Sequence, residues 1–207
     1  MEVKMYYQWE IYRTEGLFLK DLPYCKLEPK SRTRRKQSKS FLIAFGKMLE
    51  ALMAHPNAAS PNTVSANERG TGTARVITYA SASPLTMYGT EGAAGDVNYG
   101  IVVGSGTVAI ALDDYDLDTP ILNATLAHGQ STMGAASIVG SYIEIPISRS
   151  FVNVTGSPVT INEVGLACVT QYGSSTYAYL LLSRDLSTLE VAAGETAVCA
   201  LIIRTSL

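Results

Sequence analysis

The alternation of apolar and polar residues at the start of the chain predicts a β-strand. Apolar side chains occupy every second position from residue 3 to residue 11, and mainly polar ones stand between them. This period of two is typical of a strand that is buried on one face. Residues 14–16 then provide a turn, and the apolar residues 17–19 restart an extended run, so we expect an N-terminal β-hairpin.

A second pattern, between residues 41 and 53, predicts an amphipathic helix. Its apolar positions recur at intervals of three and four and form one continuous stripe. Ser38 or Ser40 can cap the start of this helix. His55-Pro56 should end it, because the residue before a proline avoids the α-helical region.

The rest of the chain reads as a long loop followed by β-structure. Residues 56–74 are rich in Pro, Ala, Ser, Thr, Asn and Gly and show no periodicity, which predicts a loop or linker. From Arg75 onward, short apolar runs alternate with turn residues, as in an antiparallel β-sandwich or jelly roll. The apolar phase flips at Asn162-Glu163, which predicts a β-bulge there. The expected strands are 75–82, 99–103, 107–112, 134–139, 141–154, 159–170, 176–184 and 196–204.

These patterns predict a mainly β protein in three parts. Residues 1–55 would form a docking and packing region of hairpin, connector and helix, 56–74 a linker, and 75–207 a β-sandwich domain. Only 16% of residues are charged, against about 25% in typical domains, which favours a surface covered by other copies of the chain. The long, apolar terminal strands 2–12 and 196–204 would then join subunits by strand addition.

Charge is distributed unevenly along the chain. Residues 1–55 carry a net charge of +5 and residues 56–207 a net charge of −7, which suggests different neighbours for the two parts. Residues 30–39 form a basic connector. It lacks interleaved aromatic residues and fits no nucleic-acid-binding module, which makes nucleic acid an unfavoured partner. A solvated segment is the first interpretation, and a surface for an acidic neighbouring protein is the second. The candidate docking residues are Lys30, Arg32, Arg34, Arg35, Lys36 and Lys39, with Tyr7 and Trp9 on the first strand.

The stretch Asn98–Ile121 contains two motifs that suggest ligand chemistry. Gly104-Ser105-Gly106 with Ala109 fits a GxGxxA pattern, but the alternating run 107–112 predicts a strand where a dinucleotide fold needs a helix. We therefore expect the glycines to turn a hairpin. Asp114, Asp116 and Asp118 have the 1-3-5 spacing of a calcium loop, without the glycine and glutamate that an EF-hand requires. They predict either a capped, solvated turn or a calcium site of another kind.

Other functional classes find little support in the sequence. The chain has two histidines and three widely spaced cysteines, and no catalytic set stands in a recognisable context. We expect no enzymatic activity, no cofactor other than the candidate calcium, and buried, inert thiols at Cys168 and Cys199. The N-terminus lacks an apolar signal region, and no stretch has the length to span a membrane.

Several segments resemble structural proteins of tailed bacteriophages and prophages. The stretch "YGIVVGSGTVAIALDDYDLDTPI" is similar to a strand "GIVVGTG" followed by "DDY-L--PI" in those proteins. "SRSFVNVTGSPVTINEVGL" and "LLSRDL…VAAGETAVCALII" resemble two later segments of theirs, and "SFLIAFGKMLEAL" resembles the N-terminal "SFVRNFLNLLYAL". The unusually basic connector departs from that pattern, which leaves open how such a protein attaches.

The resemblance implies a non-enzymatic virion protein that assembles in many copies. It would decorate or stabilise a capsid, or build a neck or tail, with copies of itself and other virion proteins as partners. It would reside in the host cytoplasm before assembly and in the virion afterwards. The alternative is a receptor- or glycan-binding module of a tail fibre, which exposed aromatic residues such as Tyr88 and Tyr172 would support.

Overall fold

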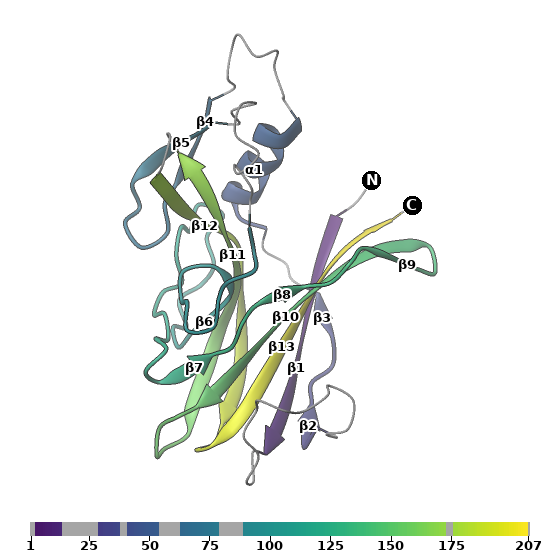
Figure 1. The fold of residues 1–207 in the computed structure, drawn as a ribbon, viewed down its shortest axis with the longest axis vertical. Helices are drawn as coiled ribbons and strands as arrows, with labels where there is room; N and C mark the ends of the chain where they lie inside the picture. The colour runs from purple at the N-terminus through teal and green to yellow at the C-terminus, as the bar shows by residue number, and fades with distance from the viewer. Residues whose placement is uncertain are drawn as a thin grey trace.

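A computed structural model describes residues 3–13, 29–37, 41–53, 63–78, 89–172 and 176–206 of the 207-residue chain. These ranges form a mainly β fold with antiparallel sheets and one helix, as the sequence predicted (Figure 1). The expected second strand of the N-terminal hairpin and the helix-capping residues lie outside the described ranges.

The first sheet is built on three long antiparallel strands. In spatial order these are β1 (Val3–Arg13), β13 (Glu195–Ser206) and β10 (Tyr142–Asn153). Short strands extend both edges of this core. The edge of β1 carries β2 (Ser31–Arg32) and β3 (Lys36–Gln37), and the edge of β10 carries β7 (Leu126–His128), β8 (Thr132–Met133) and β9 (Ser137–Val139).

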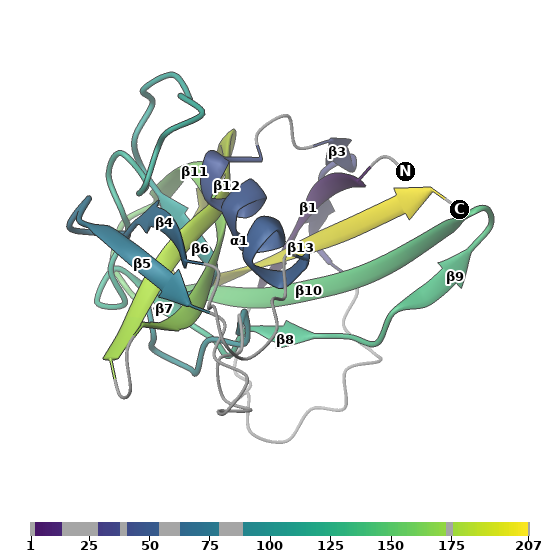
Figure 2. The same cartoon turned by 90° about the horizontal axis from the view of Figure 1, so that it is seen from above.

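The second sheet has three strands, in the order β12 (Thr176–Val191), β11 (Val159–Tyr172) and β6 (Gly100–Gly104). A register shift between Ile161 and Glu163 confirms the predicted β-bulge. A separate hairpin, β4 (Thr63–Asn67) and β5 (Ala74–Thr78), and the helix α1 (Ile43–Met53) lie at one end of this sheet (Figure 2). The helix matches the predicted stripe.

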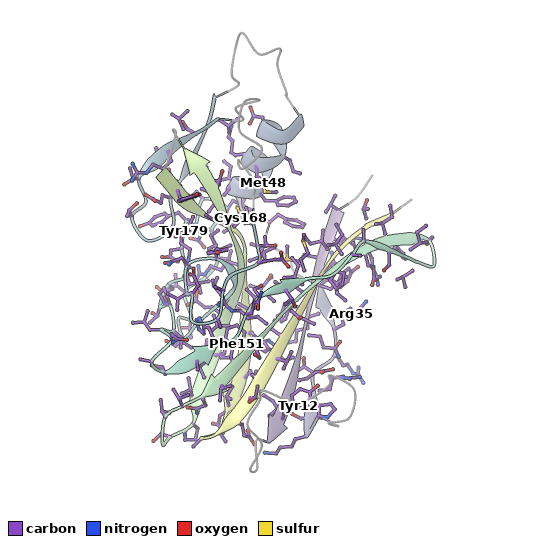
Figure 3. All side chains as sticks on the ribbon, in the orientation of Figure 1. Tyr12, Arg35, Met48, Phe151, Cys168 and Tyr179 are labelled. Carbon is purple, nitrogen blue, oxygen red and sulfur yellow. The ribbon has the colours of Figure 1, made fainter. Side chains whose placement is uncertain are left out.

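The two sheets enclose one hydrophobic core. The rings of Trp9 and Phe151 lie 6.0 Å apart within it, and Figure 3 marks Phe151 and Cys168 inside the body of the molecule. Cys168 and Cys199 are fully buried, and burial raises the pKa of the Cys168 thiol to about 12, so neither behaves as a reactive thiol.

The outer face of the second sheet is covered as well. A smaller cluster joins Leu42, beside the helix, and Leu117, from the loop after β6, to Ala167 and Leu181. This cover explains the runs in β11 and β12 that are apolar on both faces.

The N-terminal strand belongs to the sandwich itself. β1 pairs with β13 along its whole length, from Val3 opposite Thr205 to Arg13 opposite Glu195. β13 is paired on its other edge with β10, and the outer edge of β1 carries β2 and β3. The two terminal strands therefore use these edges within one chain, which leaves no support for the expected strand addition between subunits through them. Because β1 pairs with β13, residue 55 does not separate the two sheets.

The expected linker at residues 56–74 contains regular structure. The β4–β5 hairpin begins at Thr63, and its turn is closed by hydrogen bonds such as Glu68 N to Thr73 O, at 2.8 Å. The pattern of this segment did not predict β4, because its buried apolar side chains, Val64 and Ala66, stand among polar residues.

Candidate functional site: an aspartate loop fastened by buried arginines

The segment after β6 is a loop, and the predicted strand 107–112 is absent from it. Residues 105–112 have no strand pairing, and Val108 and Leu112 are 58% and 72% exposed. The expected hairpin at Gly104-Ser105-Gly106 is therefore wrong. Side chains from the neighbouring sheet hold this segment, which we call the aspartate loop (residues 105–119).

Glu163 and Arg184 form a buried ion pair beneath the aspartate loop. The Arg184 Nε donates to Glu163 Oε2 at 2.7 Å, and the two side chains are 2% and 0% exposed. The Glu163 carboxylate also accepts hydrogen bonds from the backbone N–H groups of Gly106, Asp118 and Thr119, at 2.8–3.1 Å. One carboxylate thus ties both ends of the loop to β11, at the register shift between β11 and β12.

Arg184 fastens the middle of the same loop. Its Nη1 donates to Asp114 Oδ2 at 2.6 Å, and its Nη2 donates to the carbonyl of Val108 at 3.0 Å. Burial alone would lower the pKa of the guanidinium, but the hydrogen bonds to Asp114 and Glu163 outweigh it, and the pKa is raised. The guanidinium is therefore a permanent cation with fixed partners.

The two glycines of the GxGxxA pattern are required by this carboxylate. A Cβ on Gly104 would lie 2.7 Å from Glu163 Oε1 and 2.8 Å from the carbonyl of Thr119. A Cβ on Gly106 would overlap the same oxygen and the side chain of Asp118. The glycines therefore admit a protein carboxylate close to the backbone, in the position where a nucleotide fold would admit a phosphate.

The three aspartates of the candidate calcium site face different neighbours. Asp114 binds Arg184, and Asp116 binds Arg69, whose Nε lies 2.6 Å from Asp116 Oδ1. Arg69 also donates to the carbonyls of Val97 and Asn98. Within the described ranges, no three carboxylate, imidazole or thiolate groups converge on a point where they could hold a metal ion. Calcium binding at Asp114, Asp116 and Asp118 stays a prediction.

A second buried arginine, Arg149 on β10, fastens the segment before β6. It is 1% exposed and donates to five backbone carbonyls, those of Ala93, Asp96, Tyr99, Ile101 and Gly129. Burial lowers its pKa to about 10, so the side chain is still charged at neutral pH. This role could not be predicted from sequence patterns, because the five acceptors are main-chain groups.

His128 is buried beside this arginine. Its ring stands edge-on to Phe151, with centroids 5.1 Å apart. Burial and the charge of Arg149 lower its pKa from the usual 6.5 to about 4, against a smaller opposing effect of the Asp96 backbone. At neutral pH the imidazole is therefore an uncharged core residue.

The basic connector lies along the outer edge of β1. Residues 30–37 cover that edge with backbone hydrogen bonds such as Thr33 N to Trp9 O, at 2.9 Å. Three of the candidate docking residues form ion pairs within the chain: Lys30 with Glu195, Arg32 with Glu10, and Arg35 with Glu144. Arg34 and Lys36 are exposed, and Lys39 lies outside the described residues.

Tyr7 and Trp9, the aromatic docking candidates, lie in the core of the chain. They are 5% and 1% exposed, and their polar atoms bind Leu186 O and Ser187 Oγ on β12. The expectation that they contact a partner is wrong, because the apolar face of β1 turns towards the second sheet.

A small depression lies beside the aspartate loop. Its volume is about 200 Å³, and it is lined by α1, β4 and residues 113–115. Ligand pockets usually measure about 300–1,000 Å³, so this depression offers little room for a cofactor.

Comparisons of the chain with protein-family models, with curated proteins and with solved structures gave no match. No helical segment of the described ranges combines the length and the apolar character that crossing a membrane requires.

Proposed function

We propose that this protein is a non-enzymatic structural component of a tailed virus particle and assembles there in many copies. It decorates or stabilises the capsid, or forms part of the neck or tail. The resemblance of its sequence segments to phage structural proteins motivates the proposal.

The observation that best supports an architectural role is that the buried charged side chains bind groups of the same chain. The hydrogen bonds that these side chains, Glu163, Arg184 and Arg149, form within the described ranges all go to loops and strands of the fold. A catalytic or ligand site instead needs charged groups that face an open pocket. These three side chains fasten long loops to a rigid sandwich, as a protein that must keep its shape in an assembly requires.

Deletion of the encoding gene from the viral genome tests this proposal. We expect particles that lack a layer or part, or that fail to assemble, when they are imaged by electron microscopy. Supplying the full chain from a plasmid should restore them. Normal, infectious particles of unchanged protein composition in the absence of the gene would contradict the proposal.

The alternative, a receptor- or glycan-binding module, draws on exposed tyrosines. Tyr115 and Tyr177 are 42% and 56% exposed, and tyrosine is enriched at recognition surfaces. The side chains of Tyr88 and Tyr172 lie outside the described residues. Binding of the purified chain to a host-cell glycan array, lost on replacing Tyr115 or Tyr177 with Ser, would favour this alternative.

A further inference from the structure

A hairpin arm projects from one corner of the first sheet. It comprises residues 132–142, which include β8, β9 and the turn into β10. Every residue of this arm is exposed. Figures 1 and 2 both show β9 and its turn extending away from α1 and from the second sheet, beside the two chain ends.

The surface of the arm is apolar and carries no charge. Residues 119–143 contain no Asp, Glu, Lys or Arg. Ile138 is 73% exposed on one face of the arm, and Val139 and Tyr142, which are paired across the turn, are 47% and 39% exposed on the other. Exposed apolar groups on both faces of a projecting hairpin are typical of a segment that another chain covers.

The arm also has a free strand edge. Its turn is the two-residue Gly140-Ser141, with Gly140 at a φ of +64°. In such a hairpin the flanking residues Val139 and Tyr142 exchange hydrogen bonds, so the N–H and C=O of the next residue, Ile138, point outward. Natural proteins usually protect such an edge with charge, proline or a covering segment, and this arm contains no charged residue or proline.

Three longer strands have covering segments on their outer edges. Residues 30–37 cover β1, and the residues after the aspartate loop cover β6 through Ile121 N to Val103 O, at 2.9 Å. The edge of β12 accepts hydrogen bonds from Leu42 N and Arg69 N, at 2.9 and 2.7 Å. The outer edge of β9, on an uncharged arm that projects from the molecule, is therefore the edge at which we expect strand addition.

We propose that the arm binds the same arm of a second copy, with the two β9 strands antiparallel across a two-fold axis. Ile138 then pairs with its counterpart, exchanges two backbone hydrogen bonds with it, and joins the two first sheets into one. This inference rests on the proposed function only in that a component present in many copies brings neighbouring copies close together.

The chemistry of the arm favours a second copy as the occupant. In this two-fold pairing Ile138 lies opposite its own counterpart and the residues around it lie opposite one another, so charges of one sign in the arm would repel across the axis. The absence of charge over 119–143 meets this condition, whereas the basic connector and the aspartate loop do not. Ile143 shares the face of Ile138, directly opposite it, which widens the apolar contact.

Charge variants at Ile138 test the pairing in the full chain. Ile138→Lys and Ile138→Glu each place like charges opposite one another at the axis, while a mixture of the two variants places opposite charges there. Leu122→Lys is the matched control, because Leu122 is 60% exposed in a loop away from the arm. Oligomeric state is measured by sedimentation velocity over a concentration series, and folding is checked by Trp9 fluorescence.

We expect the wild type and Leu122→Lys to dimerise or assemble further. Each Ile138 variant should weaken the association at least about tenfold, and the mixture should restore it. A monomeric wild type, or an Ile138→Lys variant that associates like the wild type, would overturn the arm pairing. Neither result would contradict an architectural role, which the gene deletion tests separately.

Discussion

Replacing Arg184 with Met should destabilise the protein more than the loss of any exposed ion pair. The substitution keeps most of the side-chain volume and removes the guanidinium. It leaves Glu163 fully buried, with three backbone donors but without its cation. It also releases Asp114, whose carboxylate lies 2.6 Å from Arg184 in the folded chain.

The expected loss follows from these contacts. Breaking a buried ion pair by removing one partner costs about 3–5 kcal/mol, because the remaining charge stays in the core. The two lost hydrogen bonds to carboxylates contribute roughly 1.5–3 kcal/mol each, which gives a similar total, and the bond to the Val108 carbonyl is lost with them. For a chain of this size, about 3 kcal/mol corresponds to a decrease in Tm of at least roughly 6 °C.

The assay is urea unfolding followed by the fluorescence of Trp9, the chain's single tryptophan, which is 1% exposed between the sheets. Arg32→Met is the control, because it breaks an Arg–Glu pair of the same 2.6 Å length whose side chains are 58% and 24% exposed. We expect it to cost under about 1 kcal/mol. Protein concentration is held constant, so that any self-association contributes equally. A loss below about 1 kcal/mol for Arg184→Met would refute the reasoning.

Three further substitutions test other parts of the structure. Gly106→Ala would force a Cβ against the Glu163 carboxylate and should lower the free energy of unfolding by at least about 2 kcal/mol. Gly156→Ala, which has open space around it, should lower it much less. Equal effects of the two substitutions in urea unfolding would contradict the role of Glu163 in holding the loop. His128 has a folded-state pKa of about 4, below its usual 6.5, so the unfolded chain binds this proton more readily and stability falls as pH drops from about 6.5 to 4. This loss, up to roughly 3 kcal/mol, should be reduced in His128→Phe, and unfolding curves of identical pH dependence would contradict the assignment. Trp9→Ala should lower the free energy of unfolding by about 3–5 kcal/mol, measured by thermal unfolding with circular dichroism. An unchanged Tm together with impaired assembly would instead show that Trp9 contacts a partner.

Local patterns predicted the sandwich because its strands and helix bury residues at regular intervals. The stripe at 41–53 became α1, and the phase flip near Glu163 coincides with the register shift between β11 and β12. Both features are set by the spacing of apolar residues within a short stretch of the chain, so they can be predicted from the sequence alone.

The loop contacts were not predictable in the same way. Residues 107–112 alternate like a strand, yet the carbonyl of Val108 accepts a hydrogen bond from Arg184, which lies 76 positions further along the chain. Nothing local marks Arg184, Glu163 or Arg149 as buried, because their partners are distant side chains and main-chain groups. The basic connector misled for a related reason: its cations pair with Glu10, Glu144 and Glu195 on strands that only the fold brings together.

Quantitative mass spectrometry of density-gradient-purified virus particles tests the central claim most directly. If the protein is an architectural component, it should occur at a fixed and high copy number relative to the major capsid protein. That ratio should persist after a high-salt wash, because apolar strand pairing is insensitive to salt screening. Particles that contain only traces of the protein, or that lose it on washing, would contradict the account.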